Sequence, residues 1–248
     1  MRIKRTKESI DYKDTQAFFN ERVKKYKAEN PYSVTMYQDN NPKLVEERNR
    51  KETEKLLPLL KLDSESKILD VACGIGRWSD AISEEICEYC GIDFCDGFIQ
   101  KAKERNLDKP NRQFFVGRDT EIDRVLGSEK NGNFNRVLLI GALMYLNDED
   151  VNITLRKIEA ACDKNSIICV REPIGLEERL TLKKEFSEEL DDDYSVIYRT
   201  REELMSYFLD NFISKGFKVA EEGFMFGDAR LNNRKETTQY YFVFERKD

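Results

Sequence analysis

The chain has 248 residues, of which 40% are hydrophobic and 36% are charged, and its formal charge is -6. Fifteen Phe and eleven Tyr supply enough apolar area for an ordinary core, which excludes a disordered chain and favours one soluble domain with or without an appendage. The longest uncharged apolar run, at 137–146, is too short to cross a bilayer. No apolar segment follows the basic start, so we expect a cytoplasmic protein without membrane insertion.

The first 66 residues differ in charge from the rest of the chain. They carry fifteen basic and twelve acidic residues, a charge of +3, which leaves -9 on the remaining 182 residues. Helical spacing is present at 14–27 and 42–60, with an aromatic and polar loop between them at 30–38. We therefore predict an N-terminal helical arm or lid at 1–66, followed by a second unit at 67–248.

From Lys67 onward, short apolar runs alternate with amphipathic segments. We predict strands at 67–71, 87–92, 113–116, 136–140, 166–170, 218–224 and 238–244. We predict helices at 77–84, 97–105, 148–162 and 201–215. This order indicates an α/β protein, with a mostly parallel sheet covered by helices on both faces and a closing antiparallel hairpin. The segment at 174–198 is interpreted as a polar insertion.

The six cysteines and the absence of histidine limit the chemistry. The cysteines lie mostly in apolar runs, which predicts reduced, buried thiols. Cys87, Cys90 and Cys95 are close in sequence, but a four-ligand metal site would need a fourth thiolate from elsewhere, so we expect no metal. Without histidine, Ser-His-Asp and Cys-His mechanisms are excluded, and any general base must be Asp, Glu, Lys, Tyr or Cys.

The most informative stretch is the glycine turn that follows the strand predicted at 67–71. Gly74 and Gly76 allow close backbone approach to a ligand, and Ser79 stands where a dinucleotide fingerprint has its third glycine. Asp93, nineteen residues after Gly74, ends the next strand at a spacing that suits a carboxylate bound to a ribose. We therefore expect a nucleoside site. The alternative is a tight turn and a strand-terminal Asp that caps a helix.

At this point the sequence resembles the class I S-adenosylmethionine-dependent methyltransferases. Five segments carry the resemblance in the family's order, at 69–76, 91–102, 114–120, 134–148 and 166–173. The likeness is strong over 67–172 and moderate at 216–217 and 239–244. It implies a seven-stranded, Rossmann-like sheet, mostly parallel with an antiparallel last strand, with helices on both faces and the N-terminal helical arm beside it. It also implies S-adenosylmethionine as cofactor and S-adenosylhomocysteine as product.

A nicotinamide enzyme that uses the same crevice is the nearest competitor, but the motif order and the final hairpin argue against it.

The resemblance assigns roles to individual residues. Asp70 would organise the loop amides and the amino-acid end of the cofactor, Asp93 would accept hydrogen bonds from the ribose, and Phe94 would lie against the adenine. Asp119, with the backbone of its neighbours, would reach the exocyclic amine. The other cofactor contacts that we expect are Ala72, Gly74, Gly76, Arg77, Arg118, Thr120, Ile140 and Gly141. For Phe94 a core aromatic, and for Asp119 a turn acid, are the alternatives. Tyr37 in the arm is expected to cover the cofactor or acceptor as part of a lid, or else to dock on the outside of the sheet.

Acceptor contacts are expected where strand ends and the arm meet. Tyr145, Arg171 and Glu172 follow the fourth and fifth strands, with Glu172 as a base or amine anchor and Arg171 as an anion anchor. A surface ion pair and a strand-end cap are the alternatives. Arg199 after the polar insertion is expected to add a lid contact, or else to belong to a charged helix start.

The acceptor itself is left open. Arg-Glu-Pro at 171–173 and Tyr-Arg at 198–199 are similar to methyltransferase portions of enzymes that cap bacterial surface polysaccharides, which favours O-methylation of a sugar or sugar-linked group on a small molecule or glycan. The alternatives are N-methylation of an amine or a tRNA base, and a non-catalytic cofactor-binding scaffold subunit. The acidic balance disfavours nucleic acid without excluding it, and Arg230, Arg234 and Lys235 are left open as a basic cluster, with a solvated hairpin as the alternative. We expect a monomer or a homodimer.

Overall fold

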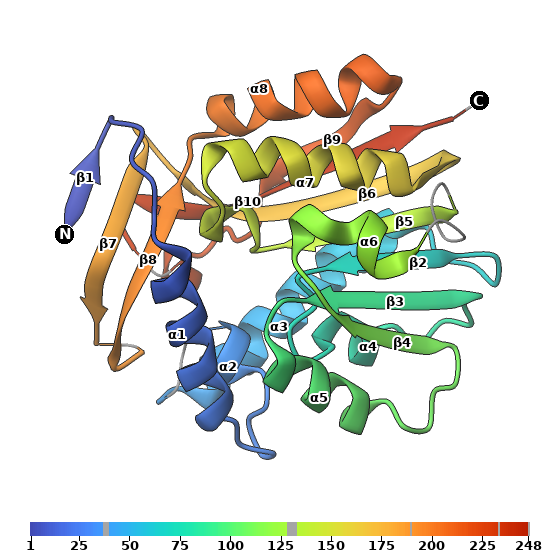
Figure 1. The fold of residues 1–248 in the computed structure, drawn as a ribbon, viewed down its shortest axis with the longest axis horizontal. Coiled ribbons are helices and arrows are strands. Elements are labelled where there is room, and N and C mark those ends of the chain that lie inside the picture. Colours follow the sequence, from blue (N-terminus) through green and yellow to red (C-terminus); the bar gives the residue numbers. More distant parts are fainter. Residues whose placement is uncertain (37–39, 128–132, 189, 233, 248) are drawn as a thin grey trace.

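A computed structural model describes residues 1–36, 40–127, 133–188, 190–232 and 234–247. Its centre is a seven-stranded sheet in the order β4-β3-β2-β5-β6-β10-β9 (Figure 1). The strands are β2 (Lys67–Val71), β3 (Glu88–Asp93), β4 (Arg112–Val116), β5 (Phe134–Ile140), β6 (Cys162–Gly175), β9 (Lys218–Phe224) and β10 (Thr237–Arg246). Only β10 runs antiparallel to its neighbours, β6 and β9. The predicted sheet, its parallel strands and its antiparallel last strand are confirmed.

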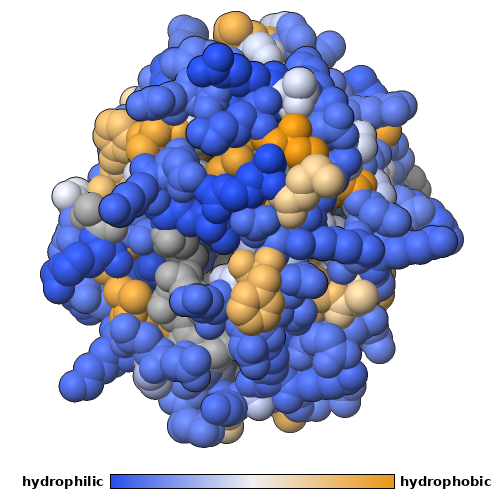
Figure 2. Space-filling model, turned by 90° about the vertical axis from the view of Figure 1, so that its left-hand side faces the viewer, coloured by the Kyte–Doolittle hydropathy of each residue, from blue (hydrophilic) through white to orange (hydrophobic). Residues whose placement is uncertain are grey.

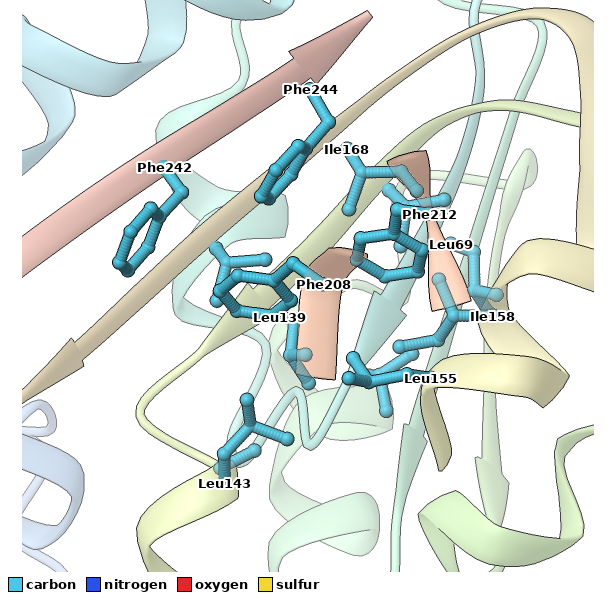
Figure 3. Close-up of a cluster of buried hydrophobic side chains, with 14 of the residues drawn as sticks. Leu69, Leu139, Leu143, Leu155, Ile158, Ile168, Phe208, Phe212, Phe242 and Phe244 are labelled. Carbon is cyan, nitrogen blue, oxygen red and sulfur yellow. The ribbon is translucent and has the colours of Figure 1, made fainter. Parts of the chain in front are cut away.

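Helices cover both faces of this sheet, because successive residues of each strand point to opposite sides. In β2, Leu69 and Val71 pack against one group of helices and Ile68 against the other. The first group is α6 (Ile122–Leu126), α7 (Asp148–Ala161) and α8 (Arg201–Asn211), and the second is α3 (Pro42–Leu56), α4 (Arg77–Ala81) and α5 (Asp96–Arg105). Figure 3 shows the first cluster, where α7 and α8 meet the sheet through Leu155, Ile158, Phe208, Phe212, Phe242 and Phe244.

The arm begins with α1 (Tyr12–Lys24), followed by the short α2 (Ser33–Met36) and by α3. Helix α1 begins two residues before the prediction because the Asp11 side chain caps it, accepting the N–H of Lys13. Helix α3 continues as the 3-10 helix η1 (Leu57–Leu60), which contains Pro58. The loop predicted at 30–38 contains α2, while 37–39 lie outside the described residues. The arm boundary at residue 66 remains a prediction.

The interpretation of 174–198 as a polar insertion is wrong. This segment holds β7 (Leu180–Ser187) and β8 (Asp192–Tyr198), which form a second, antiparallel sheet with β1 (Arg2–Lys4). One face of this sheet packs against α1 through the buried side chains Phe18, Phe19, Leu180, Leu182, Tyr194, Val196 and Tyr198. Frequent Lys, Glu and Asp between those apolar positions mask the strand pattern in the sequence.

The small sheet and α1 lie beyond the carboxyl ends of the parallel strands (Figure 1). Figure 2 looks onto this end of the molecule and shows a mainly hydrophilic surface with separate hydrophobic patches. The small sheet and the arm therefore form a roof that is apolar inside and faces solvent outside. Among the described helices, none combines the length and apolar character needed to cross a membrane.

Candidate active site

A cavity of about 230 Å³ lies at the carboxyl edge of the parallel strands. Because these strands point the same way, the residues that follow β2, β3, β4 and β5 meet there. The sheet side contributes Ala72, Gly74, Asp93, Phe94, Phe98, Arg118, Asp119, Thr120, Ile140, Gly141, Ala142, Tyr145, Leu146 and Asp150. The roof contributes Tyr12, Thr15, Gln16 and Phe19 from α1 and Thr35 from α2. Nine of the thirteen residues predicted to contact a cofactor line this cavity.

The glycine turn needs left-handed backbone at three positions, with φ of 61° at Ala72, 56° at Gly74 and 80° at Gly76. At Gly74 an added Cβ would lie 2.9 Å from a Thr35 methyl carbon, so the turn and the roof approach each other closely here. Gly76 lies elsewhere: an added Cβ would meet Asn106 and Phe114, each at 3.3 Å. Gly76 is not among the residues that line the cavity, so its expected ligand contact stays a prediction, and its missing side chain lets the turn pack against α5 and β4.

Two further predicted contacts, Asp70 and Arg77, also lie away from the cavity. The Asp70 carboxylate accepts a hydrogen bond from the Tyr89 hydroxyl, and burial raises the pKa of Asp70 to about 7. Arg77 turns towards α3, where it donates to the Asn49 amide oxygen at 3.0 Å and forms an ion pair with Glu52 at 2.9 Å. Both residues support the turn from behind. Tyr37 lies outside the described residues.

Asp93 ends β3 with its carboxylate in the cavity. One oxygen accepts the N–H of Gly74 and the other accepts the N–H of Cys95, each at 2.9 Å. Burial raises the pKa of Asp93 to about 6, although these two N–H groups act in the opposite direction. One backbone donor per oxygen leaves acceptor capacity on both, which suits the two adjacent hydroxyls of a ribose.

The other end of the cavity suits a flat base with an amine. Phe94 and Phe98 both line it, and the ring of Phe19 meets Phe94 edge-on at 5.3 Å between centroids. Asp119 uses one oxygen to accept the N–H of Thr120 at 3.0 Å, and burial raises the pKa of Asp119 to about 7. Asp93 can accept hydrogen bonds from a diol, Phe94 offers an aromatic surface and Asp119 can accept from an amine. Together these three features fit an adenosine.

No local sequence pattern reveals the contribution of α1 to this cavity. Tyr12 closes one side: its hydroxyl donates to Asp150 and accepts the N–H of Asn147 at 2.9 Å. More than a hundred residues separate Tyr12 from these partners, so only the folded chain brings them together.

A second cavity, of about 90 Å³, adjoins the first. Four residues line both: Thr35, Ile140, Gly141 and Tyr145. The remaining walls come from the arm, β6, the small sheet and the segment before β10, with Met36, Arg48, Glu52, Met144, Arg171, Pro173, Ser187, Leu190, Tyr194, Tyr198, Phe226, Leu231, Arg234, Thr237 and Gln239. Three arginines and one carboxylate line this cavity, so its net charge is positive.

Tyr145 and Arg171 thus lie where an acceptor was predicted, but Glu172 and Arg199 do not. The Glu172 carboxylate accepts the N–H groups of Ala142, Leu143 and Met144 at 2.7, 2.9 and 3.2 Å, and the residue is 1% exposed. Burial raises the pKa of Glu172 to about 7. Its expected role as a base facing the acceptor is corrected: it holds the turn that follows β5.

Arg199 is likewise corrected from a lid contact to a buried structural group. Its guanidinium bonds Asp148 at 2.7 and 2.9 Å and the carbonyl oxygens of Leu143 and Leu146 at 2.8 and 2.7 Å. These bonds fix β8 and the start of α8 to the main body.

Arg234 differs from Arg171, which forms an ion pair with Glu52 in the second cavity. The Nε of Arg234 donates to the Tyr194 hydroxyl at 2.9 Å, and that hydroxyl lies 3.3 Å from the Tyr198 hydroxyl. Within the described part of the chain, no carboxylate lies within ion-pair distance of Arg234. The half-buried guanidinium of Arg234 lines this cavity, so the alternative of a solvated hairpin does not describe Arg234.

Comparison with known proteins agrees with this geometry. Residues 68–165 match the methyltransferase domain family. Phosphoethanolamine N-methyltransferase 1 of Caenorhabditis elegans is 28% identical over 123 residues, which are 50% of this chain and 24% of that protein. The Arabidopsis thaliana protein of the same name is 24% identical over 110 residues, which are 44% of this chain and 22% of that protein. The chain thus spans about a quarter of the length of these relatives.

Solved structures show the same fold. Haemonchus contortus phosphoethanolamine N-methyltransferase 1, in complex with phosphoethanolamine and S-adenosylhomocysteine, matches with a TM-score of 0.70 and 17% identity over 96% of this chain and 50% of that one. The [4+2]-cyclase SpnF matches with a TM-score of 0.61 and 12% identity over 80% of each chain.

The sheet order, the glycine turn and the adenosine-shaped cavity define a protein of the Rossmann-like methyltransferase class. Residues 68–165 are similar to the methyltransferase domain family, which supports the predicted class I S-adenosylmethionine-dependent methyltransferase family with S-adenosylmethionine as cofactor. Within the described residues, no group of three or more potential Cys, Asp or Glu ligands could hold a metal ion.

Proposed function

We propose that this chain transfers the methyl group of S-adenosylmethionine to the nitrogen of a small amine that also carries an anionic group such as phosphate. The observation that carries the proposal is the basic second cavity, which meets the cofactor cavity at Ile140, Gly141 and Tyr145. An acceptor in the second cavity would present its reacting atom at this junction, with its anionic end among the arginines.

We propose that Asp93 binds the ribose, Asp119 the adenine amine and Phe94 the adenine face. The backbone at Ala72 and Gly74 would hold the methionine part, with Ile140 and Gly141 below the sulfur. The cofactor supplies an already activated methyl group. The protein therefore has to align the two reactants and exclude water, and the roof formed by α1 and the small sheet suits that task.

The surroundings of the junction support an amine over a sugar hydroxyl. A hydroxyl keeps its proton until it reacts and needs a base in that step, whereas an ammonium can release its proton to water beforehand and then presents a lone pair to the methyl group. Of the carboxylates near the second cavity, Glu172 is bonded to three backbone N–H groups and Glu52 to two arginines. The names of the relatives, phosphoethanolamine N-methyltransferases, favour the same acceptor class. O-methylation of a sugar stays a prediction with weaker support.

Arg234 is the group that we propose to bind the anionic end of the acceptor. The Arg171 guanidinium forms an ion pair with Glu52, but Arg234 is held only by tyrosine groups among the described residues. A phosphate could accept from the remaining N–H groups of Arg234 and from the hydroxyls of Tyr194 and Tyr198. A charged oxygen is therefore a better occupant here than a neutral group.

A matched acceptor panel tests the proposal. Release of S-adenosylhomocysteine would be measured with phosphoethanolamine, ethanolamine, a hexose, a hexose phosphate and bulk tRNA, and mass spectrometry would locate the methyl group. We expect turnover with phosphoethanolamine, at least tenfold lower kcat/KM with ethanolamine, and methylation at nitrogen. Faster turnover of the hexose or tRNA would contradict the proposal. Cofactor binding without turnover of any acceptor would favour the scaffold alternative.

A further inference from the structure

One buried carboxylate connects the two cavities. Glu52 lies on α3, outside the segment that matches the methyltransferase family, and it is 1% exposed. One of its oxygens lies 2.9 Å from Arg77 and the other contacts Arg171. Burial alone would raise the pKa of Glu52, but Arg171 and Arg77 hold it below its ordinary value.

The two arginines belong to different parts of the site. Arg77 is the first residue of α4, directly after the glycine turn that carries Gly74 into the cofactor cavity. Asn49, one turn before Glu52 on α3, bonds the same guanidinium at 3.0 Å. Helix α3 therefore holds the end of the glycine turn with two side chains.

Arg171 forms the wall at the junction. Its carbonyl oxygen accepts the N–H of Gly141 at 2.7 Å, and its Nη1 lies 3.0 Å from the position that a Cβ on Gly141 would take. The guanidinium thus lies against the bare backbone of Gly141, which lines both cavities. Gln239 on β10 accepts a hydrogen bond from the same Nη1 at 3.2 Å.

We propose that Glu52 is a positioning and specificity-determining residue, which holds Arg171 against Gly141 and neutralises it so that Arg234 remains the anion-binding arginine. The inference rests on the proposed function. With Glu52 in place, the acceptor's anion goes to the far side of the second cavity and its amine reaches the junction. Without Glu52, Arg171 becomes a second anion site next to the junction, so phosphate binds more tightly but the amine is misaligned for transfer.

Glu52→Gln tests this inference, with Glu54→Gln as the matched control. Glu54 lies on the same helix, is 60% exposed and pairs with Arg50 across one turn. Inorganic phosphate would be titrated by calorimetry into each protein saturated with S-adenosylhomocysteine. We expect Glu52→Gln to bind phosphate at least fivefold more tightly than the natural chain, Glu54→Gln to be unchanged, and Glu52→Gln combined with Arg171→Gln to lose the gain.

Turnover supplies the second readout. Glu52→Gln should lower kcat at least tenfold and also lower the KM for the acceptor, whereas a loss of folded protein lowers the apparent kcat and leaves KM unchanged. Folded Glu52→Gln with unchanged phosphate affinity would overturn the proposal. If Glu52→Gln fails to fold, Arg171→Lys replaces it, because lysine keeps the charge but cannot lie flat on Gly141. In this variant kcat should fall while the affinity for the cofactor stays the same. An unchanged kcat would overturn the proposal.

The phosphate titration does not depend on which acceptor is the natural one. Failure of the proposed function would appear as a natural chain that does not methylate phosphoethanolamine. A gain of phosphate affinity in Glu52→Gln would still establish that Glu52 neutralises Arg171.

Discussion

The two cavities differ in how the chain builds them. The cofactor cavity takes its floor from the ends of consecutive parallel strands, and three carboxylates, Asp93, Asp119 and Asp150, face one cation, Arg118. The acceptor cavity draws on the arm, β6, β8 and the segment before β10, and arginines outnumber carboxylates there. In the proposed function, the methyl donor and the acceptor meet between an acidic cavity built from consecutive strand ends and a basic cavity built from distant segments. Changes on one side should leave binding on the other side intact.

The largest expected effect is on the cofactor side. Asp93→Ala should weaken S-adenosylmethionine binding at least 100-fold, because it removes the proposed acceptor of both ribose hydroxyls and each hydrogen bond to a charged group contributes about 1.5–3 kcal/mol. Calorimetry checks this, with the exposed Asp96→Ala as control. Equal cofactor affinity in Asp93→Ala and the natural chain would show that the diol binds elsewhere.

Glu172→Gln should affect both cavities, since it acts on the turn between them. One carboxylate oxygen would become an NH2 group that faces backbone N–H donors. We expect a loss of about 2 kcal/mol of stability, or a fall in Tm of about 4–8 °C for a chain of this size. Thermal unfolding and turnover would be measured together. Normal Tm with strongly reduced kcat would restore Glu172 as a catalytic base.

Arg234→Gln should act on the acceptor side alone. We expect the KM for phosphoethanolamine to rise about 10- to 30-fold, because one charge-assisted bond to the phosphate is lost. Cofactor affinity should stay constant. Arg230→Gln is the control, as its guanidinium is 79% exposed and pairs with Asp228. Equal KM values for the two variants would exclude Arg234 as the anion anchor.

The smallest expected effect is that of pH on cofactor affinity. The pKa of Asp93 is raised to about 6 by burial, so this carboxyl is ionised above that pH and gains its proton below it. Because the ionised form is the better acceptor for two hydroxyls, affinity should fall as pH drops through 6, by about tenfold at pH 5 relative to pH 8. Protonation of Asp119 leaves a carbonyl oxygen that still accepts from an amine. A flat profile from pH 8 to 5 would contradict this prediction. A fall in affinity that persists in Asp93→Asn would assign the titration to another group.

The difference in construction also explains what sequence could predict. The seven strands, the glycine turn and Asp93 with Phe94 follow from short patterns, because each strand end and its turn are adjacent in the chain. β7 and β8 were missed because charged residues interrupt their apolar positions. Arg234 and Glu52 could not be recognised, since nothing near either residue reveals Tyr194 or Arg171 as its neighbour. A motif gives the order of residues and not the direction in which each side chain points, so the sequence alone does not reveal that Arg77 turns towards α3.

The order of strands in the large sheet bears on how the enzyme is synthesised. β10 lies between β6 and β9 and is the last of the strands to leave the ribosome. All strands beneath the cofactor are made by residue 140, about a hundred residues earlier. Gln239, which completes the second cavity, therefore reaches the sheet only after every strand beneath the first cavity has been made.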